Sequence, residues 1–292
     1  MKLDNLQGLL YFLQVSDGFD KNIINNICTR RDYVDVFYQY SDSKTDHLHT
    51  AKLFYGDNIL VDLNDEVGRN LFIYGVFEPE TAFYIYNNLC ENDYFIDIGA
   101  HTGFYAHLAS RKIASGQIHV IEPSHRSFYL CERNLKHITN CHLHKFAISS
   151  QNGTAIFHDF GAHYSPYSGL SDKHRAIIDI SKDEKCYEVK TVTLEKFLEE
   201  NIVFQGNKLW IKLDIEGFEY SVIRNHLSLL RKLKPNLIVE FGGGDIELNE
   251  KLKALFIDEG VSVFEIDMYG LKMVSNLNEL DLFNYRNLLL KF

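Results

Sequence analysis

The stretch YFIDIGAHTGFY, residues 94–105, decides how the rest of the chain is interpreted. Its apolar first half is too short for a helix and is typical of a buried strand. Asp97 stands near the end of that strand, a glycine-containing turn follows, and we expect a helix over residues 104–113. This order of strand, glycine turn and helix is typical of a nucleotide-cofactor loop in an open α/β sheet.

The glycines of the loop favour one class of cofactor over another. Dinucleotide-binding loops carry three glycines as G-x-G-x-x-G, but this loop has only Gly99 and Gly103, with Ala100 after the first. A pyrophosphate needs closely packed backbone amides, so the looser loop suits a cofactor without phosphates, such as S-adenosylmethionine (SAM). We expect Gly99 to adopt positive φ and to let the backbone approach a ligand. A tight turn that binds no ligand is the alternative.

Composition limits the classes of protein to consider. The 292 residues can form one large α/β domain with a smaller N-terminal piece, and 46% hydrophobic with 24% charged residues is ordinary for a soluble globular protein. The net charge of −10 argues against nonspecific nucleic-acid binding, which requires a cationic face. Five scattered cysteines without a C-x-x-C pair are typical of reduced thiols in the cytosol. With no long apolar run in the sequence, we expect a cytoplasmic protein without a membrane span.

The N-terminal part reads as an extension. Residues 1–50 show helical spacing of apolar positions, and residues 52–62 are typical of a hairpin with a glycine-containing turn. Pro79 begins a helix expected to end near residue 89. We therefore divide the chain into a helical and β-hairpin extension, residues 1–75, and a catalytic domain, residues 76–292.

The alternation of strands and helices continues after the glycine loop. Residues 117–122 form an expected strand that ends in Glu122, which is placed to accept hydrogen bonds from the ribose hydroxyls of an adenosine. Its alternative role is to cap the next helix, which begins at Pro123 and Ser124. A third strand is expected over residues 141–147, and the backbone after it is a candidate for framing the adenine. Residues 159–186 are rich in glycine, serine, histidine, tyrosine and charged residues, and within them residues 161–171 are expected to form a long loop over the site.

A second polar stretch, LWIKLDIEGFE, occupies residues 209–219. Its first half is typical of a strand on which Lys212 and Asp214 share one face, with Glu216 next in the emerging turn. A buried parallel strand is normally apolar on both faces, so polar residues at its carboxyl end indicate the crevice where α/β proteins bind ligands. Solvent-facing charges on an edge strand are the alternative.

Seven short motifs now stand in one order: FEPE (77–80), DIGAHTG (97–103), VIEP (120–123), AIS (147–149), VTLE (192–195), KLDIEGFE (212–219) and VE (239–240). With them the chain resembles the FkbM family of SAM-dependent methyltransferases. It departs from the family pattern at Phe218, where a small residue is usual, and at Glu195, where aspartate is common. The resemblance implies a Rossmann-like, mostly parallel seven-stranded sheet with helices on both faces and an antiparallel last strand. It also implies O-methylation of a hydroxyl on a sugar, glycan or natural product.

The resemblance and the motifs together assign roles to individual residues. The expected cofactor-binding residues are Glu78, Asp97, Gly99, Ala100, His101, Thr102, Gly103, Phe104, Tyr105, Glu122, Pro123, Ser124, Ala147, Ile148 and Asp214. Glu216 is the expected general base, with Lys212 or a histidine such as His163 as the alternative, and Asp214 is expected nearest the sulfonium. A divalent cation held by Asp214, Glu216 and Glu240 could instead activate the hydroxyl.

Two other classes of function stay open at this point. An NAD(P)-dependent oxidoreductase would need the third glycine that the loop lacks. A catalytically silent Rossmann-like fold could serve as a binding module. The expected partner is a small-molecule or glycan acceptor rather than a nucleic acid.

Overall fold

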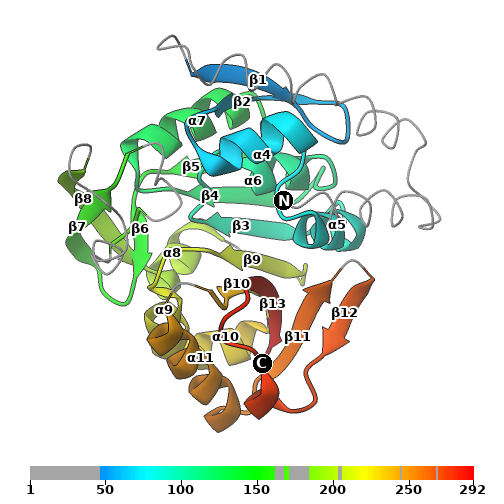
Figure 1. Ribbon diagram of the computed structural model, residues 1–292, viewed down its shortest axis with the longest axis vertical. Helices are drawn as coiled ribbons and strands as arrows, with labels where there is room; N and C mark the ends of the chain where they lie inside the picture. The colour runs from blue at the N-terminus through cyan, green and yellow to red at the C-terminus, as the bar shows by residue number, and fades with distance from the viewer. Residues whose placement is uncertain (1–46, 162–167, 171–183, 203–205, 244, 268) are drawn as a thin grey trace.

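The computed structural model describes residues 47–161, 168–170, 184–202, 206–243, 245–267 and 269–292, and its centre is one eight-stranded sheet (Figure 1). The strand order is β12-β11-β13-β10-β9-β3-β4-β5. In that order the strands are β12 (Gly270–Met273), β11 (Ser262–Asp267), β13 (Arg286–Lys291), β10 (Asn236–Phe241), β9 (Leu209–Leu213), β3 (Tyr94–Ile98), β4 (Gln117–Ile121) and β5 (Cys141–His144).

The direction of the strands confirms the expected fold class. Neighbouring strands from β10 through β9, β3 and β4 to β5 are parallel. The last strand, β13, runs antiparallel between β10 and β11. The eighth strand, β12, was not predicted, because it is a short edge strand with mostly exposed side chains and carries no apolar pattern.

Helices cover both faces of the sheet. They are α5 (Pro79–Asn88), α6 (Phe104–Ser110), α7 (His125–Leu135), α8 (Leu194–Asn201), α9 (Glu219–Asn225), α10 (Leu227–Leu233) and α11 (Ile246–Asp258), with a short 3₁₀ helix, η3 (Leu277–Glu279). Neighbouring residues of β3 enter different cores: Phe95 packs with α5 and α6, whereas Ile96 packs with α8, α9 and α11. Since side chains alternate along a strand, burial on both faces produces the continuous apolar runs of the sequence.

Two predicted elements are divided in the structure. The single strand expected over residues 141–147 ends at His144, and β6 (Ala147–Ser149) leaves the central sheet. It joins β7 (Gly153–Asp159) and β8 (Lys185–Thr193) in a separate three-stranded sheet with the order β6-β8-β7. Over residues 219–231 the sequence predicts a single helix, but the structure has two helices, α9 and α10, which meet at His226.

The N-terminal hairpin is confirmed and packs on the core. Strands β1 (Leu48–Lys52) and β2 (Asn58–Asp62) pair antiparallel, and α4 (Glu66–Tyr74) follows them. Apolar residues of both strands and of α4 belong to the same hydrophobic cluster as α6 and α7. Residues 1–46 of the predicted extension lie outside the described residues, and the boundary at residue 75 stays a prediction. Within the described part of the chain, no helix is long and apolar enough to cross a membrane.

Candidate active site

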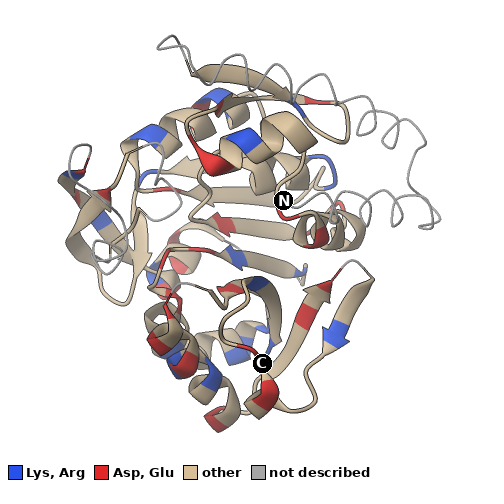
Figure 2. Cartoon of the chain, in the orientation of Figure 1, with Lys and Arg blue, Asp and Glu red and all other residues tan. Residues whose placement is uncertain are grey.

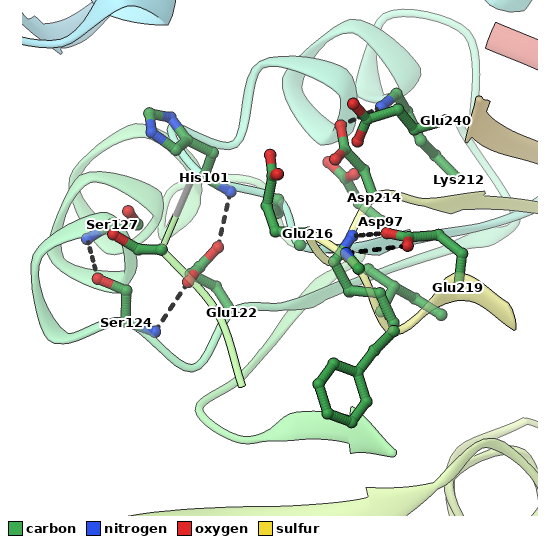
Figure 3. A pocket seen from close by; sticks show the side chains of 18 of the residues that line it. Asp97, His101, Glu122, Ser124, Ser127, Lys212, Asp214, Glu216, Glu219 and Glu240 are labelled. Carbon is green, nitrogen blue, oxygen red and sulfur yellow. Dashed lines mark hydrogen bonds and ion pairs between the residues drawn. The ribbon is translucent and has the colours of Figure 1, made fainter. Parts of the chain in front are cut away.

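A cavity of about 490 Å³ lies at the carboxyl ends of β3, β4, β9 and β10. Loops from both stretches singled out in the sequence line it, and Figure 3 shows their side chains converging. Figure 2 shows acidic segments, in red, on β3 and on the chain that leaves β9, and a basic segment, in blue, on β9. Sites of about 300–1,000 Å³ accommodate cofactors and drug-sized ligands, so the volume suits a nucleoside-sized cofactor.

Most of the predicted site residues line this cavity. They are Asp97, Gly99, Ala100, His101, Thr102, Phe104, Tyr105, Glu122, Pro123, Ser124, Ala147, Ile148, Lys212, Asp214 and Glu216. Glu78 and Gly103 do not line it. Glu78 accepts hydrogen bonds from the hydroxyls of Tyr105, at 2.5 Å, and Tyr285. A side chain at Gly103 would lie 2.7 Å from Leu135 of α7, so this glycine permits helix packing.

Gly99 has the expected positive φ, and the structure gives a further reason for a glycine at this position. Gly99 has a φ of 82°, and a Cβ there would lie 1.7 Å from the backbone oxygen of Asp214. The backbone N–H of Asp214 in turn donates to the carbonyl of Ile98 at 3.0 Å. Gly99 therefore lets the loop after β9 approach the loop after β3, which brings the two polar stretches to one cavity.

Glu122 fixes the backbone on both sides of it. Its Oε2 accepts the N–H of His101 and its Oε1 accepts the N–H of Ser124, each at 2.8 Å (Figure 3). Burial raises the pKa of this carboxyl to about 7, although these two N–H groups lower it. Because each carboxylate oxygen has a second lone pair, Glu122 can still accept hydrogen bonds from a ligand.

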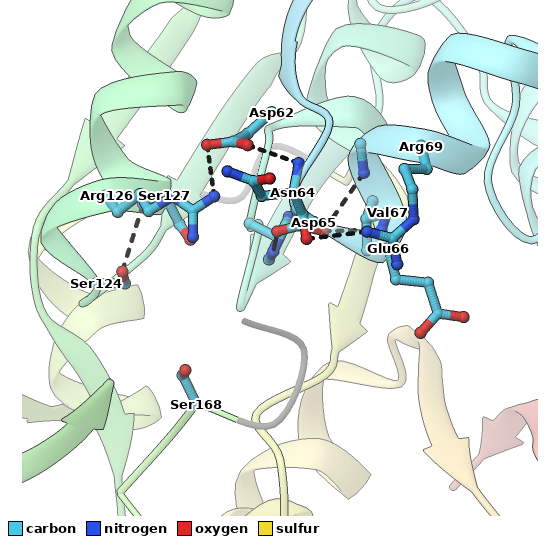
Figure 4. Close-up of polar contacts among 12 residues, drawn as sticks. Asp62, Asn64, Asp65, Glu66, Val67, Arg69, Ser124, Arg126, Ser127 and Ser168 are labelled. Carbon is cyan, nitrogen blue, oxygen red and sulfur yellow. Dashed lines mark hydrogen bonds and ion pairs between the residues drawn. The ribbon is translucent and has the colours of Figure 1, made fainter. Parts of the chain in front are cut away.

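The N-terminal extension contributes to the cofactor loop through an ion pair that the sequence did not indicate. His101 has a φ of 54°, and its Nε2 lies 2.8 Å from Oδ2 of Asp65. Asp65 also caps α4 by accepting the N–H of Val67 (Figure 4). Burial lowers the pKa of His101, but Asp65 outweighs it and raises the pKa above its usual value. A second ion pair joins Asp62 to Arg126 at 2.5 Å.

Lys212 is a buried cation surrounded by acceptors. Its Nζ lies 2.7 Å from Asp214, 3.6 Å from Glu78 and 4.9 Å from the centre of the Tyr105 ring. Burial opposes the charge, but the carboxylates of Asp214 and Glu78 raise the lysine pKa above its usual value. An ammonium group held in this way cannot accept a proton, so the geometry argues against Lys212 as the alternative base.

Three carboxyl groups meet beside this lysine. One oxygen each of Asp214, Glu216 and Glu240 lies within 4.8 Å of the other two. Burial would raise the pKa of Asp214, but Lys212 and a hydrogen bond with Glu240 lower it. Burial, and then the neighbouring acids, raise the pKa values of Glu216 and Glu240 well above the usual range. The arrangement is one ionised acid flanked by two acids that hold protons readily.

Glu219 shapes the turn that carries Glu216. Its carboxylate accepts the N–H groups of Ile215, at 2.7 Å, and Gly217, at 3.0 Å. These bonds support a positive φ of 52° at Glu216, a conformation that L-residues other than glycine rarely adopt. Glu219 belongs to the KLDIEGFE motif, but nothing local in the sequence distinguishes it from other acids or predicts this role.

Another part of the cavity wall comes from β7 of the three-stranded sheet and from residues that lie between β7 and β8 in the sequence. Phe157 of β7 and residues 168–170 line the cavity, and a Cβ added at Gly169 would lie 3.4 Å from Cβ of Glu216. This part of the predicted long loop lies at the site. Residues 162–167 and 171–183, including the alternative base His163, lie outside the described residues.

Comparison with protein families identifies the chain. The model of the methyltransferase FkbM domain matches residues 97–269, which is more than half of the chain. The chain belongs to the FkbM family. It is therefore a SAM-dependent methyltransferase and not the NAD(P)-dependent oxidoreductase considered as an alternative. As an FkbM-family enzyme it uses SAM as the methyl donor, which yields S-adenosylhomocysteine (SAH).

Two solved structures illustrate how low the sequence identity is between this FkbM-family chain and proteins of similar structure. A precorrin-6y C5,15-methyltransferase from Geobacter metallireducens is 13% identical, with 74% of this chain and 89% of that chain covered and a TM-score of 0.40. A putative methyltransferase from Streptococcus mutans in complex with SAH is 9% identical, with coverages of 72% and 94% and a TM-score of 0.40. No curated protein matches the sequence significantly.

Proposed function

We propose that the protein transfers the methyl group of SAM to a hydroxyl of a small acceptor, such as a sugar, a glycan unit or a natural product. The observation that carries this proposal is the group of Asp214, Glu216 and Glu240 on the cavity wall. SAM supplies a methyl group already activated by its sulfonium. The protein has to hold the acceptor oxygen in line with the S–CH₃ bond and to remove its proton.

The lining of the cavity is chemically suited to SAM. Ala147, Ile148 and Phe157 are buried apolar residues that could enclose the adenine. The carboxylate of Glu122 could accept hydrogen bonds from the ribose hydroxyls in addition to the two N–H groups it already binds. The acids of the cavity, among them Asp97 and Asp214, would stabilise the positive charges of the SAM amino group and sulfonium.

Glu216 is the proposed general base. Its raised pKa makes the ionised form a stronger base than an ordinary glutamate, and the approach of a cationic cofactor favours that ionised form. A general base contributes about 10²–10⁴ in rate. Glu219 and Gly169, which contact the Glu216 turn, would position it.

The charge of the cavity supports a neutral, hydroxyl-rich acceptor. Carboxylate oxygens accept hydrogen bonds from hydroxyl groups, and several of them together suit a polyol. The same acids would repel a phosphate or another anionic group close to the reacting atom. A neutral sugar hydroxyl is thus favoured over a phosphorylated or nucleic-acid acceptor.

A divalent cation is the second candidate for activating the hydroxyl. The three carboxylate oxygens lie close enough to share an ion such as Mg²⁺, which prefers oxygen ligands. Asp214, Glu216 and Glu240 would hold the ion, and the ion would lower the pKa of the bound hydroxyl. In that case Glu216 would be a ligand rather than a base.

The test combines turnover with cofactor binding. We expect Glu216→Gln to lower kcat by about 10²–10⁴ while the Kd for SAM stays within a few-fold, measured against a panel of neutral sugars and nucleotide sugars. Glu250→Gln, on the exposed face of α11, is the matched control. Full turnover by Glu216→Gln with normal SAM binding would show that Glu216 is not the general base. Loss of turnover with EDTA and its return with Mg²⁺ would favour activation of the hydroxyl by the cation.

A further inference from the structure

A second cluster of potential metal ligands lies on the three-stranded sheet, apart from the acids of the cavity. His158 on β7 and Cys186 on β8 stand directly opposite each other across the antiparallel pair. Glu184 precedes Cys186 by two residues, so its side chain lies on the same side. An imidazole, a thiol and a carboxyl group therefore meet at the end of this hairpin.

The three ligand atoms form a nearly equilateral triangle. Nδ1 of His158 lies 3.2 Å from Oε1 of Glu184 and 3.4 Å from Sγ of Cys186. The thiol sulfur lies 3.3 Å from the same carboxylate oxygen. Each of the three atoms is thus close to both of the others, so one ion could contact all three.

These distances are close to those of a zinc site. Zinc bonds of about 2.3 Å to sulfur and about 2.0–2.2 Å to nitrogen and oxygen, at tetrahedral angles, separate the ligand atoms by about 3.4–3.6 Å. The triangle needs to open by only about 0.1–0.3 Å to accept the ion at these bond lengths. Nitrogen, sulfur and oxygen together also match the ligand set of zinc, whereas Mg²⁺ and Ca²⁺ prefer oxygen alone.

We propose that His158, Glu184 and Cys186 bind one Zn²⁺ ion. The thiol loses its proton to solvent on binding, so a thiolate and a carboxylate balance the two charges of the ion and the imidazole binds in its neutral form. Cys186 is exposed, which leaves room for water as the fourth ligand.

The position of the site gives the ion a structural role at the rim of the cavity. The backbone of His158 exchanges two hydrogen bonds with Gly169, at 2.8 and 3.1 Å. Gly169 lies beside Glu216, because a Cβ added to it would be 3.4 Å from Cβ of Glu216, and Phe157, next to His158, lines the cavity. The zinc would hold β7, β8 and this rim together, beyond the chemistry of methyl transfer. Figure 1 shows β7 and β8 at the left edge of the molecule.

The first experiment measures zinc in the full chain. After exposure to Zn²⁺ and dialysis, we expect one equivalent by mass spectrometry of metals in the wild type and in Cys90→Ser, a control at another exposed thiol. Cys186→Ser and Glu184→Gln should each lose affinity by more than the ~10–100-fold that removal of an outer-shell partner costs. Retention of zinc by both variants, or its loss in Glu240→Gln with retention in Cys186→Ser, would overturn the proposal.

A second measurement uses only the wild-type chain and does not depend on a variant that folds. Co²⁺ at this site should produce the near-ultraviolet charge-transfer absorption of a cobalt–thiolate bond. Zn²⁺ should also protect Cys186 from alkylation, read by peptide mass spectrometry, and EDTA should reverse the protection. Equal alkylation with and without Zn²⁺ would contradict ligation by this thiol.

Discussion

Replacing Asp65 with asparagine tests the ion pair between the N-terminal extension and the cofactor loop. Asparagine is about as good a helix N-cap as aspartate. Its side-chain oxygen can therefore still accept the N–H of Val67, which donates to Asp65 at 2.7 Å in the wild type. What the substitution removes is the charge that faces His101 at 2.8 Å. The effect on stability therefore reports on the ion pair rather than on the cap.

The geometry sets the expected size of the effect. Unit charges 2.8 Å apart attract by about 6 kcal/mol at an effective dielectric constant of 20, before the cost of desolvation is subtracted. Net values for hydrogen bonds to charged groups are about 1.5–3 kcal/mol. Since the Asp65 side chain is 2% exposed and that of His101 19%, we expect this range rather than the smaller value of a surface pair. The folding equilibrium constant should fall about 10- to 150-fold.

The effect should depend on pH in a defined direction. Burial lowers the pKa of His101, but Asp65 and then Glu122 raise it above its usual value despite nearby Arg126. The stabilisation of the folded state by His101 is therefore fully present below about pH 6.5, and it is lost as the pH rises through the pKa that His101 has in the folded state. Burial raises the pKa of Asp65, but His101 lowers it overall, so its contribution is complete above about pH 4. The difference in free energy of unfolding between the wild type and Asp65→Asn should be largest at about pH 4–6.5, and it should be smaller near pH 9.

Urea unfolding followed by the fluorescence of the single tryptophan, Trp210, measures this gap at pH 5.5 and pH 9. The control is Asp57→Asn, which breaks a more exposed pair with Arg111, 3.2 Å long, and should cost less than about 1 kcal/mol. If Asp65→Asn destabilises equally at both pH values, or no more than the control, the ion pair does not join the extension to the loop as argued.

Three further predictions concern the cavity. Burial raises the pKa values of Asp97 and Glu122 to about 7, so both carboxyl groups ionise between about pH 6 and pH 8. Because SAM carries one more positive charge than SAH, the ratio of the SAH and SAM dissociation constants should increase over this range in calorimetric titrations. A constant ratio would contradict this. Gly99→Ala should lower the free energy of unfolding by several kcal/mol in urea, because its Cβ would lie 1.7 Å from a backbone oxygen. Gly206→Ala, which also has positive φ but open space around it, should cost about 1–2 kcal/mol. Equal losses of stability in the two variants would refute the packing argument. If the Phe157 ring stacks on the adenine, Phe157→Ala should weaken SAM binding about 5- to 150-fold. Circular dichroism would check that the variant folds. Unchanged affinity for SAM would show that Phe157 does not bind the adenine.

The glycine loop illustrates both the strength and the error of sequence reasoning. The order of strand, turn and helix was correct, because apolar runs and glycine positions are local signals. The positive φ of Gly99 was predicted correctly, but its close approach to the backbone of Asp214, more than a hundred residues later in the chain, was not predicted. The sequence likewise did not predict the partners of Glu78. Its motif indicated that it lies at the site, but its carboxylate accepts hydrogen bonds from the hydroxyls of Tyr105 and Tyr285.

The sequence alone therefore determined the fold class, the family and the loops that line the cavity. Buried strands and glycine turns leave a pattern within about ten residues, and the motifs of the family stand at such positions. Only the tertiary structure decided which charges meet, because residues from different strand ends share no periodicity along the chain. The pairing of Asp65 with His101 and the triangle of His158, Glu184 and Cys186 both follow from how the folded chain brings separate strand ends together.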